Sequence, residues 1–221
     1  MAKQTDSIEP IHRRTLHGEV LPRLRDMIIE GVLEAGMRIN ETELCMKLGV
    51  SRTPLREAIK TLAGEGLIEL VMSKGAVVRR FTRRDVANML ETIKLFEMFA
   101  AKAACTNATD AEIKAVAQLH KAMVQEYKKR NRLGYYKLNQ DIHSELVRLG
   151  GNPEIADLHT MIQARLKRIR YLGNEEPTKW AGALAEHEEM MKALAARNGN
   201  ALAEVMGRHM DQTLFRVSDT L

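Results

Sequence analysis

The hydrophobic pattern changes along the chain from a mixed arrangement of helices and strands to a purely helical one. Apolar positions recur at helical spacing in three early segments, at about residues 19–32, 40–49 and 51–64. Two short strand-like runs follow at 67–71 and 76–80, and the residues between them end in Gly75, which suits a tight turn. Three helices and a hairpin in this order predict a winged helix-turn-helix domain over residues 1–84, with a polar arm at 1–15.

From Thr82 onward the pattern is helical throughout, which predicts a mainly α protein. Six helices are expected, at about residues 82–105, 109–130, 135–149, 153–172, 179–197 and 201–219. Thr82 and Thr109 each have an acidic residue three positions later, the spacing of a capping box, which marks a helix start. Because the connections are short, neighbouring helices should run antiparallel. Residues 85–221 are therefore predicted to form an all-helical antiparallel bundle.

The basic charge of the chain is concentrated in the predicted winged domain. The formal net charge is +5. The first 84 residues hold 15 Lys and Arg against 11 Asp and Glu, whereas the remainder holds 19 against 18. An excess of this size is weak evidence for a nucleic-acid partner by itself. The positions of the cations within the domain are the stronger indication.

The third predicted helix has a basic face and an apolar face. Arg52, Arg56 and Lys60 fall four residues apart. The apolar positions between them are Leu55, Ala58, Ile59 and Leu62. In a helix-turn-helix the second helix buries one face and presents the other to the major groove, where an arginine fork can bind guanine. Ser51, expected to cap the helix, and Thr53 suit phosphate oxygens. A solvated basic face is the alternative interpretation of the same spacing.

Residues 36–80 also resemble a known family. The stretch GVSRTPLREAI, followed by EGLIE and a glycine-containing hairpin, is similar to the DNA-binding domain of GntR-family bacterial transcription regulators. The resemblance implies contacts to operator DNA from the helix and from the wing. The implied helix contacts are Ser51, Arg52, Thr53 and Arg56. The implied wing contacts, to the DNA backbone, are Ser73, Lys74 and Gly75.

Three of the seven histidines indicate a candidate metal site. His143 lies four residues after Asn139, so both side chains share one helix face. His187 and His209 belong to the last two predicted helices. Helical bundles build metal sites from such inward side chains, and this donor set suits a divalent transition metal, zinc first, with nickel, iron or manganese as alternatives. Each histidine can equally be an ordinary packed or exposed residue, because spacing gives no geometry across helices.

The resemblance extends through the second part of the chain. Residues 82–221 are similar to the all-helical FCD domain of the FadR subfamily, through the segments NQDIHSELVRLGGNPEI and EHEEMMKALAARNGNALAEVMGRHM. It implies that the metal ligands are Asn139, His143, His187 and His209. Asparagine stands where aspartate is common, and an uncharged oxygen should lower the metal affinity or change the metal. His120 and His159 fall outside the pattern and are expected to be surface or packing residues.

The same resemblance implies an effector, a small carboxylic acid bound beside the metal. The position of the family's usual arginine, four residues before Glu97, holds Ile93 here, and Lys94 is one residue off. Arg165 and Arg170 are therefore expected to bind the acid, because a guanidinium holds a carboxylate by two hydrogen bonds. A solvated basic face is the alternative for both.

Together these interpretations predict a homodimeric transcription regulator, not an enzyme, that binds double-stranded operator DNA and responds to an organic acid. A regulator for which the metal itself is the signal is the first alternative. A metal-dependent hydrolase is less favoured, because no motif for a general base is visible. The sequence has neither a signal peptide at its start nor an apolar run long enough to span a membrane, which favours a cytoplasmic protein without a membrane partner.

Overall fold

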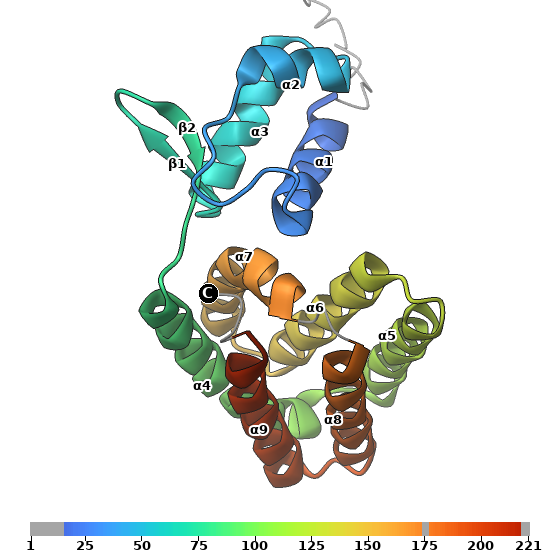
Figure 1. Cartoon of the computed structure of the whole chain (residues 1–221). Coiled ribbons are helices and arrows are strands. Elements are labelled where there is room, and N and C mark those ends of the chain that lie inside the picture. Colours follow the sequence, from blue (N-terminus) through green and yellow to red (C-terminus); the bar gives the residue numbers. More distant parts are fainter. Residues whose placement is uncertain (1–15, 174–176, 218–221) are drawn as a thin grey trace, which may run out of the picture.

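The chain folds into two parts joined by a short linker (Figure 1). The computed structural model describes residues 16–173 and 177–217, so the arm expected at 1–15 lies outside the described residues. The winged domain consists of α1 (Leu16–Glu30), α2 (Glu41–Leu48), α3 (Arg52–Gly64), β1 (Ile68–Val71) and β2 (Gly75–Val78). The bundle consists of α4 (Arg83–Asn107), α5 (Asp110–Lys128), α6 (Arg132–Leu149), α7 (Pro153–Gly173), α8 (Pro177–Ala195) and α9 (Gly199–Val217). The predicted mainly helical architecture is confirmed.

The helices of the winged domain pack around one apolar core. Leu24 of α1 and Leu55 of α3 are fully buried in it. The side chain of Asn40 caps the start of α2, and Gly49, at φ +65°, caps its end. Ser51 occupies the N-cap position of α3, but its hydroxyl makes no capping hydrogen bond. The expected cap is therefore absent, and the hydroxyl at this exposed helix start is available to another partner.

The wing is a two-stranded antiparallel hairpin in which Ile68 pairs with Val78. Gly75, at φ +74°, opens the second strand directly after the turn. The strand ends at Val78, two residues earlier than the hydrophobic pattern predicts. Arg80 turns away toward the loop after α1, where it donates to a main-chain carbonyl. Arg79 and Arg80 consequently belong to the linker between the two parts.

The bundle helices follow the predicted segments, and their starts carry the predicted caps. Thr82 and Thr109 each form a complete capping box, at α4 and α5. α6 begins at Arg132, three residues before the predicted start, because the side chain of Asn131 caps it. Within the described residues, no helix is both long enough and apolar enough to cross a membrane.

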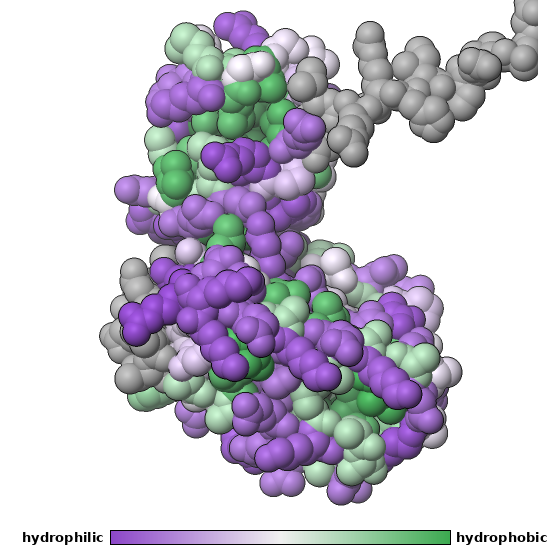
Figure 2. Space-filling model, turned by 90° about the vertical axis from the view of Figure 1, so that its right-hand side faces the viewer, coloured by the Kyte–Doolittle hydropathy of each residue, from purple (hydrophilic) through white to green (hydrophobic). Residues whose placement is uncertain are grey.

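α7 is the bundle helix that faces the winged domain (Figure 1). Its Arg168 donates from Nη1 to the carbonyls of Ile28 at 2.8 Å and Leu33 at 3.2 Å. Lys137 of α6 adds an ion pair with Asp26 of α1 at 2.7 Å. Hydrophilic side chains dominate the surface around this waist (Figure 2). These contacts are polar, and water can replace contacts of this kind.

Candidate metal centre and nucleic-acid interface

Three histidines from three different helices meet inside the bundle. α6 contributes His143, α8 contributes His187 and α9 contributes His209, and none of them is more than 2% exposed. Their ring centroids are pairwise 5.1 Å apart. One nitrogen of each ring lies within 4.8 Å of a nitrogen of each of the other two. This histidine triad brings together three of the four predicted ligands and can hold a metal ion.

Asn139, the fourth predicted ligand, lies one turn before His143 on α6 and is also buried. Its Nδ2 donates to Nε2 of His187 at 3.3 Å. Half a turn of the amide exchanges its nitrogen for Oδ1 and directs an oxygen to the same place. The structure thus puts Asn139 at the edge of the histidine triad, where it can offer a neutral oxygen.

Two carboxylates orient the histidine triad from behind. Glu97 of α4 is fully buried and accepts a hydrogen bond from Nδ1 of His143 at 2.9 Å. Glu186 of α8 accepts one from Nδ1 of His209 at 2.5 Å. A histidine that donates one ring nitrogen to a carboxylate has its other nitrogen available for a metal.

Buried ring nitrogens without a partner in the described part of the chain also indicate that the histidine triad suits a metal ion. Nε2 of His143 and Nδ1 of His187 are buried and have no hydrogen-bond partner among the described residues. Buried polar atoms in proteins nearly always have a partner, and an orphaned one requires an explanation. A metal ion would supply the partner to Nε2 of His143, whose Nδ1 is already held by Glu97, so the residues present fit such an ion.

The protonation states also suit a metal. Burial lowers the pKa of His143 and lowers the pKa values of His187 and His209 well below the ordinary value. Burial acts on Glu97 in the opposite direction, but the hydrogen bonds that it accepts from His143 and His159 hold its pKa well below the usual range. Neutral imidazoles beside an ionised carboxylate are the forms that bind a divalent cation.

Sequence reasoning missed part of this network. His159 of α7, expected at the surface or in packing, is buried and donates from Nε2 to Glu97 at 3.0 Å. His120 of α5 stacks on His187 at a centroid distance of 6.5 Å. The signal for Glu97 was present in the sequence, because it falls four residues after Ile93 on the buried stripe of α4. An acidic residue on an apolar stripe marks a buried carboxylate that needs partners.

The two arginines predicted to bind an acid lie in different places. Arg170 of α7 is 3% exposed, and its charge acts on the pKa of each triad histidine, so it lies near them. It also acts on buried Tyr136, whose hydroxyl has no hydrogen-bond partner among the described residues. Arg165 lies instead against Gly66, between α7 and the winged domain. Only Arg170 is therefore placed to meet a ligand at the histidine triad.

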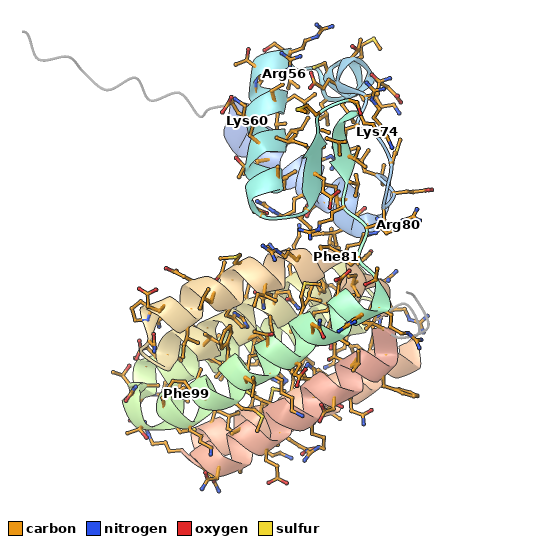
Figure 3. All side chains as sticks on the ribbon, turned by 90° about the vertical axis from the view of Figure 1, so that its left-hand side faces the viewer. Arg56, Lys60, Lys74, Arg80, Phe81 and Phe99 are labelled. Carbon is orange, nitrogen blue, oxygen red and sulfur yellow. The ribbon has the colours of Figure 1, made fainter. Side chains whose placement is uncertain are left out.

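The start of α3 presents the predicted helix contacts on an exposed surface. The exposed residues there are Ser51, Arg52, Thr53 and Arg56. Nε of Arg56 pairs with Glu41 at 2.7 Å, and Arg52 approaches Oγ1 of Thr42 at 3.5 Å. Both partners belong to the first turn of α2, which thus holds the two arginines on one side of the domain. Figure 3 places Arg56 toward the end of the winged domain that is remote from the bundle.

The wing lies beside this surface. Its tip holds Ser73, Lys74 and Gly75, all of them exposed. Arg56 and Gly75 line a shared groove between α3 and the hairpin. Figure 3 shows Lys74 on the same remote end of the winged domain as Arg56. The predicted helix contacts and wing contacts therefore adjoin at this groove, away from the junction with the bundle.

Comparisons with known proteins agree with both parts. Residues 16–78 match the gntR family of bacterial regulatory proteins, and residues 88–212 match the FCD domain. The Nta operon transcriptional regulator of Aminobacter aminovorans is 30% identical over 187 residues, which cover 81% of this chain and 85% of that protein. The transcriptional repressor RspR of Escherichia coli K12 is 25% identical over 190 residues, 86% and 83% of the two chains. The solved structure of E. coli McbR/YncC, at 18% identity, covers 94% of this chain and 99% of that chain with a TM-score of 0.80, which shows a shared fold.

Proposed function

Because the chain belongs to the GntR family of bacterial transcription regulators, in the FadR-like subfamily that carries an FCD domain, we propose that a metal-assisted carboxylic-acid ligand controls its operator affinity. The observation that carries this proposal is the buried histidine triad with Arg170 beside it. Residues 1–84 would bind DNA, and residues 85–221 would bind the metal, the acid and a second copy. The family is one of regulators, not of enzymes, and a regulator of this kind acts on the chromosome in the cytoplasm.

The winged domain would bind operator DNA through the start of α3 and the tip of the wing. Arg52 and Arg56 would read base edges, because an arginine fork matches the two acceptors of guanine. The hydroxyls and amides at the helix start, with Lys74 of the wing, would hold phosphates. The ion pair of Arg56 with Glu41 is 59% and 31% exposed, and a pair of that kind contributes little energy. DNA can therefore replace Glu41 as the partner of Arg56 at small cost.

The histidine triad and Asn139 would hold a divalent metal, with zinc as the first choice and nickel, iron or manganese as alternatives. Imidazole nitrogen suits zinc, nickel and iron, and the amide oxygen suits manganese. All four donors are neutral, so the full charge of the ion stays in the site. A bound ion would supply this charge and an open coordination position, which together attract an anion.

Arg170 and Tyr136 indicate what kind of ligand would occupy the remaining space. A guanidinium grips a carboxylate with two hydrogen bonds, and the buried hydroxyl of Tyr136 has a donor to offer. A cation and a hydroxyl beside the donor set favour a small carboxylic acid. The position of the family's usual arginine cannot bind the acid here, because it holds Ile93, a buried core residue. The neighbouring Lys94 pairs with Asp211 at 2.7 Å.

α7 would carry the response to the winged domain. Arg170 is on its buried side, whereas Arg168, two residues earlier, holds the carbonyls of Ile28 and Leu33. A ligand that draws on Arg170 therefore acts on the helix that positions the winged domain. It changes operator affinity only as far as it prefers one placement over another. We expect the acid to weaken operator binding.

A second copy would pack on α4. Leu95 and Phe99, one turn apart on that helix, are 64% and 55% exposed. Figure 3 shows Phe99 on the outer face of the bundle. An apolar pair of this size on an exposed helix favours burial against a partner. A two-fold dimer would place two winged domains over the two halves of a pseudo-palindromic operator.

The histidine triad itself favours one other candidate, a regulator for which the metal alone is the signal. Both candidates are tested by the operator dissociation constant of the full chain, first stripped with a chelator, then reloaded with zinc, then given a panel of small carboxylic acids. A change that needs metal and acid together supports the acid-responsive regulator. A change with zinc alone supports the metal sensor. A dissociation constant that stays the same in all three states contradicts both.

A further inference from the structure

Arginines cover three glycines at the junction between the winged domain and the bundle. The pairs are Arg168 on Gly31, Arg80 on Gly36 and Arg165 on Gly66. All three glycines have φ between +77° and +86°, a backbone region that other residues rarely adopt. A Cβ on each glycine would lie 3.3, 3.1 and 2.8 Å from the nearest guanidinium nitrogen of its arginine. The backbone of the winged domain is thus shaped to admit guanidinium groups at close range.

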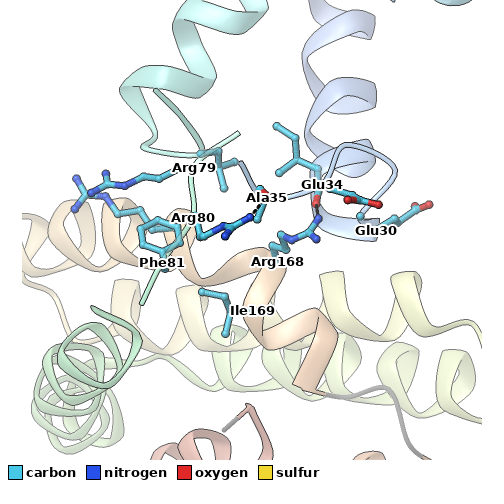
Figure 4. A pocket seen from close by; sticks show the side chains of 12 residues that line it. Glu30, Glu34, Ala35, Arg79, Arg80, Phe81, Arg168 and Ile169 are labelled. Atoms are coloured by element: carbon cyan, nitrogen blue, oxygen red, sulfur yellow. Dashed lines mark hydrogen bonds between the residues drawn. The ribbon is translucent and has the colours of Figure 1, made fainter. Parts of the chain in front are cut away.

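These arginines converge on a cavity of about 590 Å³ between the two parts, shown in Figure 4. Four arginines line it: Arg79, Arg80, Arg165 and Arg168. The acidic residues of the lining are Glu30 and Glu34. Phe81 and Ile169 supply an apolar side. The volume is in the range of small-molecule sites, and half of the twelve lining residues are charged, which favours a charged ligand.

The positive charge of this junction cavity is only partly compensated within the described residues. Arg79 pairs with Glu69 at 3.3 Å. Arg80 donates to the carbonyl of Ala35 at 3.2 Å, and Arg168 donates to two carbonyls, which carry no net charge. Burial lowers the pKa of Arg168, with only Glu34 acting in the opposite direction. Nε of Arg165 is buried without a hydrogen-bond partner. An anion with two or more oxygens would give Arg165 its partner and neutralise the excess charge.

We infer that the junction cavity binds a small dianion with carboxylate or phosphate oxygens, which bridges Arg165 and Arg168 of α7 to Arg80 of the linker. Such an anion would fix the winged domain on the bundle, because its partners belong to both parts. It would therefore regulate the placement of the winged domain by a second route.

This site is separate from the histidine triad, although both use α7. Arg165 and Arg170 are five residues apart, which corresponds to about 140° around a helix. Arg170 consequently lies inside the bundle, and Arg165 faces Gly66 of the winged domain. The inference adds a ligand to the proposed regulator and does not depend on a metal.

The test is amide hydrogen exchange of the full chain with inorganic phosphate or with succinate, against chloride at matched ionic strength. The two probes separate phosphate esters from dicarboxylates. At ten times the midpoint of the titration, exchange through openings that release the anion should slow by about tenfold in residues 31–36 and 79–82. Arg165→Gln and Arg168→Gln should remove the effect. Arg165→Lys, which keeps the charge and loses the fork, should weaken it. Arg84→Gln, an exposed arginine outside the cavity, is the matched control.

Arg170→Gln distinguishes this site from the one at the histidine triad. Slowing that survives Arg170→Gln and disappears in Arg165→Gln supports the junction site, whatever becomes of the acid-responsive mechanism. Slowing that survives Arg165→Gln and disappears in Arg170→Gln places the anion at the histidine triad and overturns the inference. The absence of slowing by either anion beyond the chloride control also overturns it.

Discussion

The imidazole of His143 donates from Nδ1 to the buried carboxylate of Glu97 at 2.9 Å, across the interface of α6 and α4. Both side chains are fully buried. The contact fixes which nitrogen of His143 carries the proton and turns Nε2 toward the other two triad histidines. It places a full negative charge directly behind a candidate metal ligand, and a carboxylate in that position raises the basicity of the imidazole.

Glu97→Gln should therefore weaken metal binding without abolishing it. Outer carboxylates of this kind contribute about 10-fold to 100-fold to metal affinity. The measurement is competition for zinc with a chromogenic chelator. Glu189→Gln is the matched control, because Glu189 is on α8 two residues after His187 and pairs at the surface with Arg208. Equal affinities for the two variants would show that Glu97 does not support the metal.

Metal binding should tolerate mild acid unusually well. Protons compete with metal for free imidazoles, so affinity falls as the pH drops through their pKa. Three histidines of ordinary pKa, about 6.5, would each be half protonated at that pH and would lose about eightfold in affinity. Burial lowers the pKa of all three triad histidines, so we expect less than about a twofold change between about pH 8 and 6.5, with weakening only below. An eightfold loss at pH 6.5 would contradict the neutral, buried triad.

Arg52→Ala and Arg56→Ala should each weaken operator binding by about 1–3 kcal/mol and affect random duplex less. Lys74→Ala should weaken both DNAs alike and reduce the salt slope by about one, because it would contact phosphate. Lys60, one turn beyond Arg56, pairs with Glu57 and provides the control substitution, Lys60→Ala. Fluorescence anisotropy at several salt concentrations measures all four variants. If both arginine variants bind the operator as tightly as the unaltered protein, the proposed placement of α3 in the major groove is contradicted.

Glutamates on α4 should separate the proposed dimer. Leu95→Glu combined with Phe99→Glu puts two like charges where an apolar pair would be buried, so the double variant should sediment as a monomer. Met46→Glu, at a 73% exposed position on α2, changes charge in the same way away from α4 and should leave the association state unchanged. A double variant that remains dimeric would place the interface on another face.

The helices were predictable because their signals are local. A capping box such as that of Thr82 with Asp85 is complete within four residues, and the structure contains it as predicted. The end of β2 was not predictable in the same way. Arg79 and Arg80 extend the strand-like run, but Arg80 is drawn to Ala35, 45 residues earlier in the chain. The early end of the strand depends on that distant partner.

The candidate metal site, like the fold, was predictable only in part. The family resemblance brought His143, His187 and His209 together from three segments, and the structure places them in one group. The carboxylates that support these histidines were not predicted. Glu97 reaches His143 from another helix, and sequence spacing does not give the place of that helix in the bundle. Arg165 and Arg170 belong to a single basic run, and only the packing of α7 decides which one faces inward.

The carboxyl end of α3 is the base of the helix, close to where Gly66 contacts Arg165, and Arg52 lies at the opposite end, the tip. Its 13 residues span about 20 Å. A lever of that length converts a tilt of about 10° at the base into a displacement of about 3.5 Å at the tip, close to one base-pair step. A rotation too small to break the core of either part would thus shift Arg52 and Arg56 by about one base-pair step relative to DNA bound as proposed.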